Sequence, residues 1–406
     1  MLEQSTNKHL TRAEIVKSGS IYTSSALVDL VHSLVSPFIT EDSVIADLGA
    51  GYGAFLEKFK NCGKHCFGTE CDNLSFQLLK EQYPALDIYH ENSLCGVHRE
   101  KYHLQSNDHL IIIGNPPYND TTSIFKKGEK GNIVCDPDLR SRDFGVCFLK
   151  AYDKLGADYV CVLHPLAYLI KKQNFKALGA FKEHYKLLSA TIFSSKEFES
   201  IQKTNAEFPV VCALYEKDGR GMEYEDVLQF SFSIYQSQAT FILGEVATID
   251  GIVNKYPKKK KQAPLGYEID LLGEKVENTD SEPRLQFYTL RDMNALCRNK
   301  AFLEGPIANG VDITLGNLYQ YAWLYFLKCN FKPKKNKFLF GNLSPLYTEA
   351  LERAEFKNMV VSYAVQHCAL IEKYFDLQKI KALYGPLTEQ YNALFEQLEV
   401  ISNLFN

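Results

Sequence analysis

The residue types best suited to chemistry stand together in the tetrapeptide Asn115-Pro116-Pro117-Tyr118. Asn115 offers an amide oxygen, and Tyr118 supplies a flat aromatic face. Between them, the two prolines fix a turn that aims the Pro116 backbone carbonyl. Two hydrogen-bond acceptors beside a stacking ring can hold the amino group and the ring of a nucleobase that has been turned out of its helix. The alternative is an ordinary proline-rich turn with no chemical role.

A second group of residues lies upstream, in the run Asp47-Leu48-Gly49-Ala50-Gly51-Tyr52-Gly53. Its glycines let the backbone approach a ligand closely, and Glu70 follows at about the spacing at which an acid accepts hydrogen bonds from ribose hydroxyls. This combination predicts a site for a cofactor that contains adenosine. The pattern G-x-G-x-G after an acid favours S-adenosylmethionine over a dinucleotide, which is typically bound by G-x-G-x-x-G.

Alternating strands and helices must hold both groups in place. Apolar runs predict strands at 44–48, 65–70, 86–90, 109–114, 159–163 and 209–215, with helices at 25–35, 54–59, 73–82 and 144–155. Strands separated by helices predict a mostly parallel sheet with helices on both faces. The Gly-rich run and the tetrapeptide each follow a strand directly, at the edge where such sheets bind ligands. We therefore expect a Rossmann-like, doubly wound α/β sheet with some mixed pairing.

In motif type and order, the sequence resembles the amino-methyltransferases of DNA, and among them the gamma class of adenine-specific enzymes. The matching segments, within roughly residues 15–216, are Gly19-Ser20-Ile21-Tyr22-Thr23, the run from Asp47 to Gly53 with Phe55, the acid Glu70, and the tetrapeptide. The resemblance implies a methyltransferase fold of about seven strands, with S-adenosylmethionine as the cofactor. The cofactor-binding residues that it implies are Tyr22, Thr23, Asp47, Gly49, Gly51, Gly53, Glu70, Asn92 and Asn115.

One position departs from the family pattern, and a second position of the pattern has two candidate residues in this chain. The family's third motif usually presents an acid to the adenine of the cofactor, whereas this chain has Asn92 there. An aromatic residue of the family covers the target base from the side opposite Tyr118. Phe198 and Phe208 are both candidates for this position, and either could instead be a core residue.

The resemblance also implies the reaction, which is transfer of a methyl group to the exocyclic N6 amine of a flipped adenine. The catalytic residues would be Asn115, Pro116, Pro117 and Tyr118, together with Phe198 or Phe208. No Pro-Cys dipeptide is present, and this argues against the covalent route of the cytosine carbon-5 enzymes. Methylation of the cytosine N4 amine, of an RNA base or of a protein glutamine remains an alternative, as does a DNA-binding subunit with a vestigial cofactor fold.

The second half of the chain differs in composition from the first. The net charge is −4, yet lysines gather without acids in two windows, 255–261 and 328–337. The candidate phosphate contacts are Lys258, Lys259, Lys260, Lys261, Lys334, Lys335 and Lys337, although two solvated loops would show the same pattern. We expect a catalytic domain at 1–216 and an α+β target-recognition domain at 217–406, with two or three helices after residue 346.

Overall composition sets the remaining expectations. The 406 residues are 46% hydrophobic and 23% charged, as in ordinary globular proteins. The 11 cysteines, odd in number and scattered, suggest reduced thiols in the cytoplasm, and their spacing predicts no metal site. No membrane segment is expected. The resemblance, rather than composition, implies double-stranded DNA as the partner, acted on by a monomer that protects host DNA in a type II restriction-modification system, with a separately encoded endonuclease as a possible companion.

Overall fold

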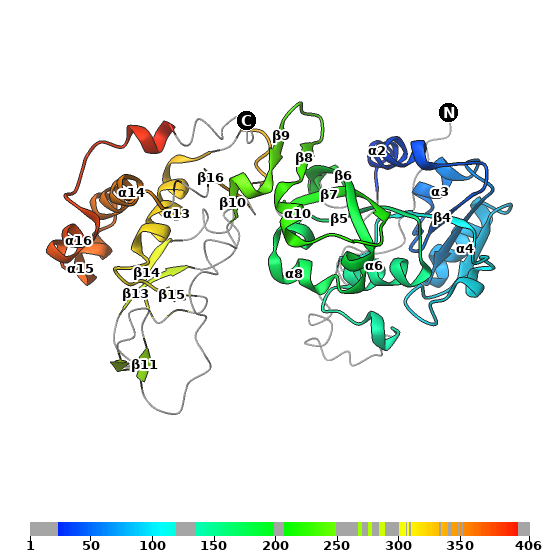
Figure 1. Ribbon diagram of the computed structural model, residues 1–406, viewed down its shortest axis with the longest axis horizontal. Helices are drawn as coiled ribbons and strands as arrows, with labels where there is room; N and C mark the ends of the chain where they lie inside the picture. The colour runs from blue at the N-terminus through cyan, green and yellow to red at the C-terminus, as the bar shows by residue number, and fades with distance from the viewer. Residues whose placement is uncertain are drawn as a thin grey trace. The chain divides into compact units, whose positions relative to one another are not determined.

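The computed structural model describes only part of the chain, and the chain divides into two compact units (Figure 1). The described residues are 23–118, 135–198, 207–248, 267–269, 275–277, 284–288, 300–305, 307, 310–332, 334–339, 343–347, 350 and 352–396. The units are Met1–Gln238 and Ala239–Asn406. The division falls later than the boundary expected at residue 216.

A large mixed sheet forms the centre of the first unit. Within the first unit its spatial order is β3-β2-β1-β4-β5-β7-β6-β8. The strands are β1 (Ser43–Asp47), β2 (His65–Glu70), β3 (Asp87–His90), β4 (His109–Gly114), β5 (Tyr159–Pro165), β6 (Tyr185–Ser194), β7 (Pro209–Lys217) and β8 (Ser231–Ile234). From β3 to β5 all neighbours are parallel, whereas β7 runs antiparallel to both β5 and β6.

Helices cover this sheet on both sides. They are α2 (Ser25–Val35), η1 (Ser36–Phe38), α3 (Ala54–Phe59), α4 (Asn73–Gln82), η2 (Arg99–Tyr102), η3 (Pro137–Leu139), α6 (Phe144–Leu155), α7 (Ala167–Ile170), α8 (Lys172–Ala177), α9 (Ala180–His184), η4 (Ser195–Glu197) and α10 (Tyr224–Gln229). Every residue of β1 is buried. Because successive strand residues point to opposite faces, both faces must be covered. Ile45 and Ile111 pack on one face in a core with Leu27 and Phe59.

The predicted fold class, a doubly wound mixed sheet, is confirmed, but the sheet is larger than the expected seven strands. The extension begins with β8, which pairs in parallel with β6. In β8, Phe232 and Ile234 are buried while the residues before each of them are exposed. Four residues with only two buried positions give too weak an alternation to be recognised as a strand from sequence.

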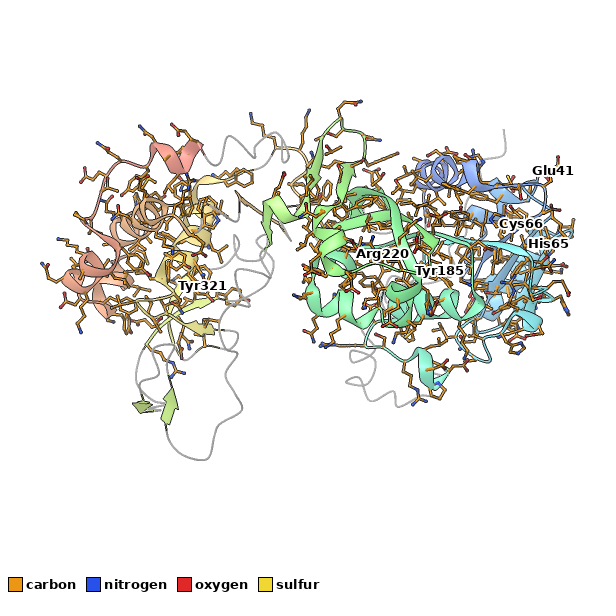
Figure 2. All side chains as sticks on the ribbon, viewed as in Figure 1. Glu41, His65, Cys66, Tyr185, Arg220 and Tyr321 are labelled. Carbon is orange, nitrogen blue, oxygen red and sulfur yellow. The ribbon has the colours of Figure 1, made fainter. Side chains whose placement is uncertain are left out.

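The second unit is an α+β region, as expected. Its strands are β9 (Thr240–Ile242), β10 (Val246–Thr248), β11 (Tyr267–Ile269), β12 (Lys275–Glu277), β13 (Arg284–Tyr288), β14 (Phe302–Gly305), β15 (Gly310–Asp312) and β16 (Leu343–Tyr347), and its helices are α13 (Leu318–Asn330), α14 (Ala354–His367), α15 (Ala369–Tyr374) and α16 (Leu377–Tyr384). Trp323 and Phe326 of α13 pack against Phe356 and Tyr363 of α14. Figure 2 shows the side chains, with Tyr321 marking α13 and Tyr185 marking the start of β6.

No helix in the described ranges of either unit is both long enough and apolar enough to cross a membrane.

Candidate active site

Three of the predicted site residues, Asp47, Glu70 and Asn115, lie at strand ends on one edge of the large sheet. Since β1, β2 and β4 are parallel, their carboxyl ends share that edge. Asp47 ends β1 and pairs in register with Ile113 of β4. Gly114 then ends β4, and a Cβ atom on it would lie 3.0 Å from Asp47 Oδ1. The carboxylate therefore lies directly against the strand end that leads into Asn115, and only glycine leaves it full room there.

The Gly-rich turn after β1 is held by hydrogen bonds from its backbone. The Gly49 N–H donates to Asp47 Oδ1 at 3.3 Å, and the Gly51 N–H donates to Glu70 Oε2 at 2.9 Å. Gly51 has φ +55, and within the part of the chain that the structure describes, no atom beyond its two chain neighbours lies within 4 Å of the position that its Cβ would take. Gly53 has φ +80, but its Cβ would lie 2.6 Å from the Tyr83 ring. Gly51 thus borders open space, whereas Gly53 is required by packing.

Glu70 faces this turn from the end of β2. Its other oxygen, Oε1, accepts the Asp72 N–H at 2.7 Å. The pKa of Glu70 is raised above its ordinary value, because the effect of burial outweighs that of the backbone hydrogen bonds from Asp72 and Gly51, which lower it. A carboxylate has about four lone-pair sites, so Glu70 can accept further hydrogen bonds from a ligand while it orders the turn.

Asp47 is almost completely buried, with 2% of its surface exposed. The pKa of Asp47 is raised to about 7, mainly by burial. The Gly49 hydrogen bond opposes this rise, and the neighbouring charge of Glu70 adds to it. The carboxyl group is therefore partly protonated near neutral pH.

We expect replacement of Asp47 by asparagine to reduce the dependence of stability on pH. In the wild type, the folded pKa of about 7 exceeds the unfolded value of about 4. The folded state binds this proton more tightly, so the contribution of Asp47 to stability is greatest below about pH 4 and is lost as the pH rises through about 7. Asp47→Asn lacks this loss. Thermal unfolding of both proteins near pH 5 and near pH 8 measures this pH dependence. If Tm changed equally between the two pH values in the wild type and in Asp47→Asn, the prediction would be contradicted.

The tetrapeptide follows β4, and its Asn115 amide has a fixed orientation. Asn115 Nδ2 donates to Thr23 Oγ1 at 3.0 Å, and the Tyr118 hydroxyl donates to Asn115 Oδ1. Burial, followed by the charges of Cys212 and Asp143, raises the pKa of Tyr118 well above its usual range. The hydroxyl therefore stays protonated and remains a donor. Pro116 is buried, while Asn115, Pro117 and Tyr118 are half-buried.

The two candidate phenylalanines lie at the same edge but differ in exposure. Phe198 is fully buried and packs against Phe193, with the ring centroids 5.6 Å apart. Its ring centroid lies 6.5 Å from that of Tyr118. Phe208 is half-buried and pairs with Ser195 through hydrogen bonds of 2.9 and 3.1 Å. The structure thus brings Phe198 close to Tyr118 and leaves Phe208 the more accessible ring.

The remaining predicted residues belong to other elements of the chain or lie outside the described ranges. Asn92 follows β3, and its Oδ1 accepts the Leu94 N–H at 2.9 Å. Lys334, Lys335 and Lys337 are exposed in the second unit. Tyr22 and the lysines at 258–261 lie outside the described residues. Within the described ranges, no group of His, Cys, Asp or Glu side chains is arranged to hold a metal ion.

Asp143 and Tyr168 are neighbours of the tetrapeptide that the sequence did not single out. Asp143 caps α6 by accepting the Gly145 N–H at 2.9 Å, and it also accepts the Tyr168 hydroxyl. Its contribution to the pKa of Tyr118 places its charge near the tetrapeptide. An aspartate before a helix is a capping signal, so its structural role was readable from sequence. Nothing in the sequence indicated the contact with Tyr168.

Many solved structures are similar to part of this chain, including the following three. A candidate RNA methyltransferase from Pyrococcus horikoshii is 17% identical, with 50% of this chain and 88% of that chain covered and a TM-score of 0.34. A candidate class I S-adenosylmethionine-dependent methyltransferase from Listeria monocytogenes is 14% identical, with 57% and 75% covered and a TM-score of 0.38. A type I restriction-modification methyltransferase subunit from Streptococcus thermophilus is 12% identical, with 50% and 46% covered and a TM-score of 0.34. No family model and no curated protein matches the chain.

Proposed function

We propose that this protein is a DNA methyltransferase that transfers a methyl group from S-adenosylmethionine to the N6 amine of a flipped adenine. The observation that carries the proposal is the position of Asn115. Its amide follows the carboxyl end of β4, is oriented by Thr23 and Tyr118, and adjoins the strand end against which Asp47 lies. Protection of host DNA in a restriction-modification system is the biological role that we propose with it.

The residues at the sheet edge fit the proposed cofactor. Open space borders the Gly51 backbone, where a ligand can approach the turn closely. The Glu70 carboxylate is ordered by Gly51 and Asp72 and can accept hydrogen bonds from ribose hydroxyls. Thr23, Gly49 and Asn92 would complete the binding residues. When bound, S-adenosylmethionine supplies an electrophilic methyl group.

The chain's own residues would hold and activate the target amine. Asn115 Oδ1 accepts one hydrogen bond from Tyr118, and its second lone pair can accept another from the amine. The Pro116 carbonyl supplies the second acceptor. These acceptors stabilise the positive charge that develops on nitrogen during transfer. The Tyr118 ring would stack on the flipped base and offset part of its unstacking cost.

DNA binding by the second unit forms part of the same proposal. Lys334, Lys335 and Lys337 are exposed, and the segment 328–337 contains no acid. Such a segment suits contacts with the phosphates of double-stranded DNA. We propose that the first unit carries catalysis and that the second contacts the target duplex. The protein would act as a monomer, beside a restriction endonuclease encoded separately.

Methylation of the cytosine N4 amine or of an RNA base is the alternative, because the same acceptors suit any exocyclic amine. Incubating native genomic DNA and total RNA separately with labelled cofactor, followed by nucleoside analysis, distinguishes these products. N6-methyladenine in DNA is the expected result, and long-read mapping then gives the target sequence. Label found only in N4-methylcytosine or only in RNA would replace the adenine assignment.

The ring and the hydroxyl of Tyr118 should contribute differently. Tyr118→Phe keeps the stacking face and loses the hydrogen bond to Asn115, so it should remain active. Tyr118→Ala should lower kcat/KM about tenfold to a hundredfold, because stacking of a base on an aromatic ring is worth about 1–3 kcal/mol. Steady-state kinetics on methylatable DNA measures both variants. Equal losses would show that the hydroxyl, through Asn115, matters more than the ring.

Neutralising the lysines at 334, 335 and 337 should weaken DNA binding without changing the methylated site. Removal of each lysine–phosphate interaction should lower the slope of log affinity against log salt by about 0.9. Phosphate contacts do not read sequence, so affinity should fall for all duplexes alike. Titrations of the triple alanine variant at several salt concentrations measure the slope. An unchanged slope would mean that these lysines form a solvated loop.

A further inference from the structure

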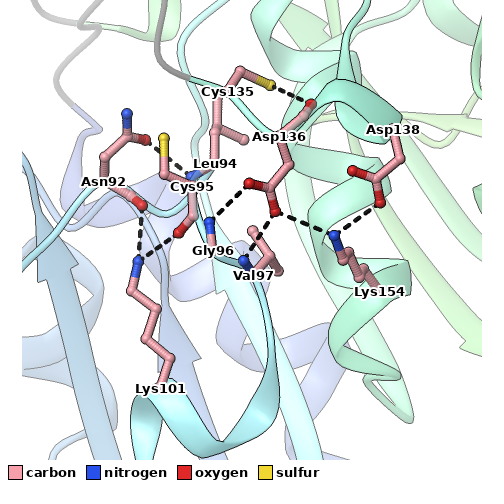
Figure 3. A network of polar contacts seen from close by, with 10 residues as sticks. All are labelled: Asn92, Leu94, Cys95, Gly96, Val97, Lys101, Cys135, Asp136, Asp138 and Lys154. Carbon is pink, nitrogen blue, oxygen red and sulfur yellow. Dashed lines mark hydrogen bonds and ion pairs between the residues drawn. The ribbon is translucent and has the colours of Figure 1, made fainter.

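The loop that follows β3 carries Asn92, and two charged side chains hold its backbone. Residues 91–97 form neither helix nor strand, so their buried peptide groups need other partners. Lys101, from η2, donates to the carbonyl oxygens of Asn92 at 3.0 Å and Cys95 at 2.8 Å (Figure 3). It also pairs with Glu91 at 3.3 Å. One lysine therefore takes up the acceptors on one part of the loop.

Asp136 takes up the donors of the same loop. Its Oδ1 accepts the Gly96 N–H at 2.8 Å and its Oδ2 accepts the Val97 N–H at 3.0 Å (Figure 3). The Asp136 N–H donates in turn to the Leu94 carbonyl at 2.8 Å. The N–H groups of Val97 and Gly96, with Lys154, hold the pKa of Asp136 at about 2. The carboxylate is thus charged throughout the neutral range, and these charge-assisted hydrogen bonds persist there.

The same aspartate connects the loop to α6. Lys154 of α6 pairs with Asp136 at 3.1 Å and with Asp138 at 2.8 Å (Figure 3). In the first half of α6, the Phe148 ring lies 3.9 Å from the position that a Cβ on Gly49 would take. Asp136 therefore links two elements beside the proposed cofactor site: the loop that bears Asn92, and the helix that packs against the Gly-rich turn.

We infer that Asp136 is a positioning residue for the cofactor site. It fixes the loop at 91–97, and with it Asn92, relative to α6 and the Gly-rich turn. This inference rests on the proposed function, because it assumes that S-adenosylmethionine binds beside Asn92. Asp136 itself need not touch the ligand. It acts through the backbone that it holds.

The matched pair Asp136→Asn and Asp138→Asn tests this role. Each variant removes one of the two carboxylate partners of Lys154, but only Asp136→Asn disturbs the bonds to Gly96 and Val97. We expect Asp136→Asn to raise the Kd of S-adenosylmethionine, measured by calorimetry, about tenfold, as for loss of one or two charged hydrogen bonds. Amide hydrogen exchange at Gly96 and Val97 should quicken. Asp138→Asn should stay within about twofold of wild type in both measurements.

Other outcomes separate failure of the inference from failure of the proposed function. If the wild type binds S-adenosylmethionine and Asp136→Asn binds it equally well, the inference fails and the proposed function stands. A wild type that does not bind the cofactor at all overturns both. Should Asp136→Asn fail to fold, Lys101→Met releases the same loop from its carbonyl side and should weaken binding in the same way. Unchanged affinity in Lys101→Met would then overturn the inference.

A double-mutant cycle adds a measurement that a merely structural residue would not change. If Asp136 acts by placing Asn92, its effect on cofactor affinity should largely disappear in the Asn92→Ala background. Additive effects of the two substitutions would show that Asp136 does not act through Asn92, and would overturn the inference in this form.

Discussion

Asn115→Ala should lower the rate of methyl transfer by about a hundredfold to a thousandfold, as removal of one group that stabilises transition-state charge typically does. Cofactor affinity should change only a few-fold, because the proposed role of the Asn115 oxygen is toward the amine of the base. Single-turnover kinetics with labelled cofactor and genomic DNA measures the rate, and calorimetry measures the affinity. A rate within tenfold of wild type would contradict the role assigned to Asn115.

Thr23→Val is the control for this experiment. It removes the hydroxyl that accepts the Asn115 amide at 3.0 Å but keeps the amide oxygen itself and nearly the same volume. At saturating S-adenosylmethionine, which removes any effect of the cofactor contact proposed for Thr23, we expect a smaller loss than in Asn115→Ala, because the orientation of the amide is loosened while its oxygen is kept. Losses of equal size would show that orientation by Thr23, rather than the presence of the oxygen, limits the reaction.

Gly51→Val should weaken binding of S-adenosylmethionine more than any other change to the Gly-rich turn. The branched side chain would occupy the open space beside Gly51, where the cofactor is proposed to approach the backbone. Its φ of +55 would also strain any residue with a Cβ, by roughly 1–2 kcal/mol. We expect at least about a hundredfold increase in Kd, equivalent to about 2.8 kcal/mol. Calorimetric titration of the purified variant measures it.

Gly156→Val separates blocked binding from backbone strain. Gly156 has φ +65, and the nearest atom to an added Cβ is the end of the flexible Lys217 side chain at 3.1 Å. The glycine follows α6 and precedes β5, so it lies at the sheet edge opposite the proposed site. Gly156→Val should therefore lower Tm about as much as Gly51→Val does, but it should leave the affinity for S-adenosylmethionine unchanged. Equal affinity losses in both variants would mean that Gly51 matters only for folding.

Most elements of the first unit were predictable because local signals agree with one another. The ranges 65–70, 73–82, 109–114 and 144–155 are exact in the structure. The two helices among them begin after Asp72 and Asp143, whose side chains accept N–H groups of the first turn. An apolar run of six residues, or a helical pattern preceded by a capping aspartate, leaves little ambiguity. The short strand β8 carries no such signal.

The candidate site was predictable where its residues adjoin strand ends, as Asp47, Glu70 and Asn115 do. Contacts between residues far apart in the chain were not. No local pattern joins Thr23 to Asn115, or Asp136 to Gly96, because each contact depends on how separate loops meet after the sheet has formed. The same limit applies to Phe198, whose complete burial follows from packing against Phe193 and not from its neighbours in sequence. The roles of all these residues stay predictions.

The pairing of β1 bears on how the chain reaches its native state. One neighbour of β1 is β2, the next strand along the chain, but the other is β4, which is made only after β2, α4 and β3. Bringing β4 to β1 closes a long loop of chain, and this costs conformational entropy before the new contacts compensate for it. Sheets that pair strands far apart in the sequence therefore fold slowly. Asp47 meets Gly114 only through this pairing. On a ribosome the site can therefore form no earlier than β4 emerges, and until then one edge of β1 carries backbone N–H and C=O groups without their native partners.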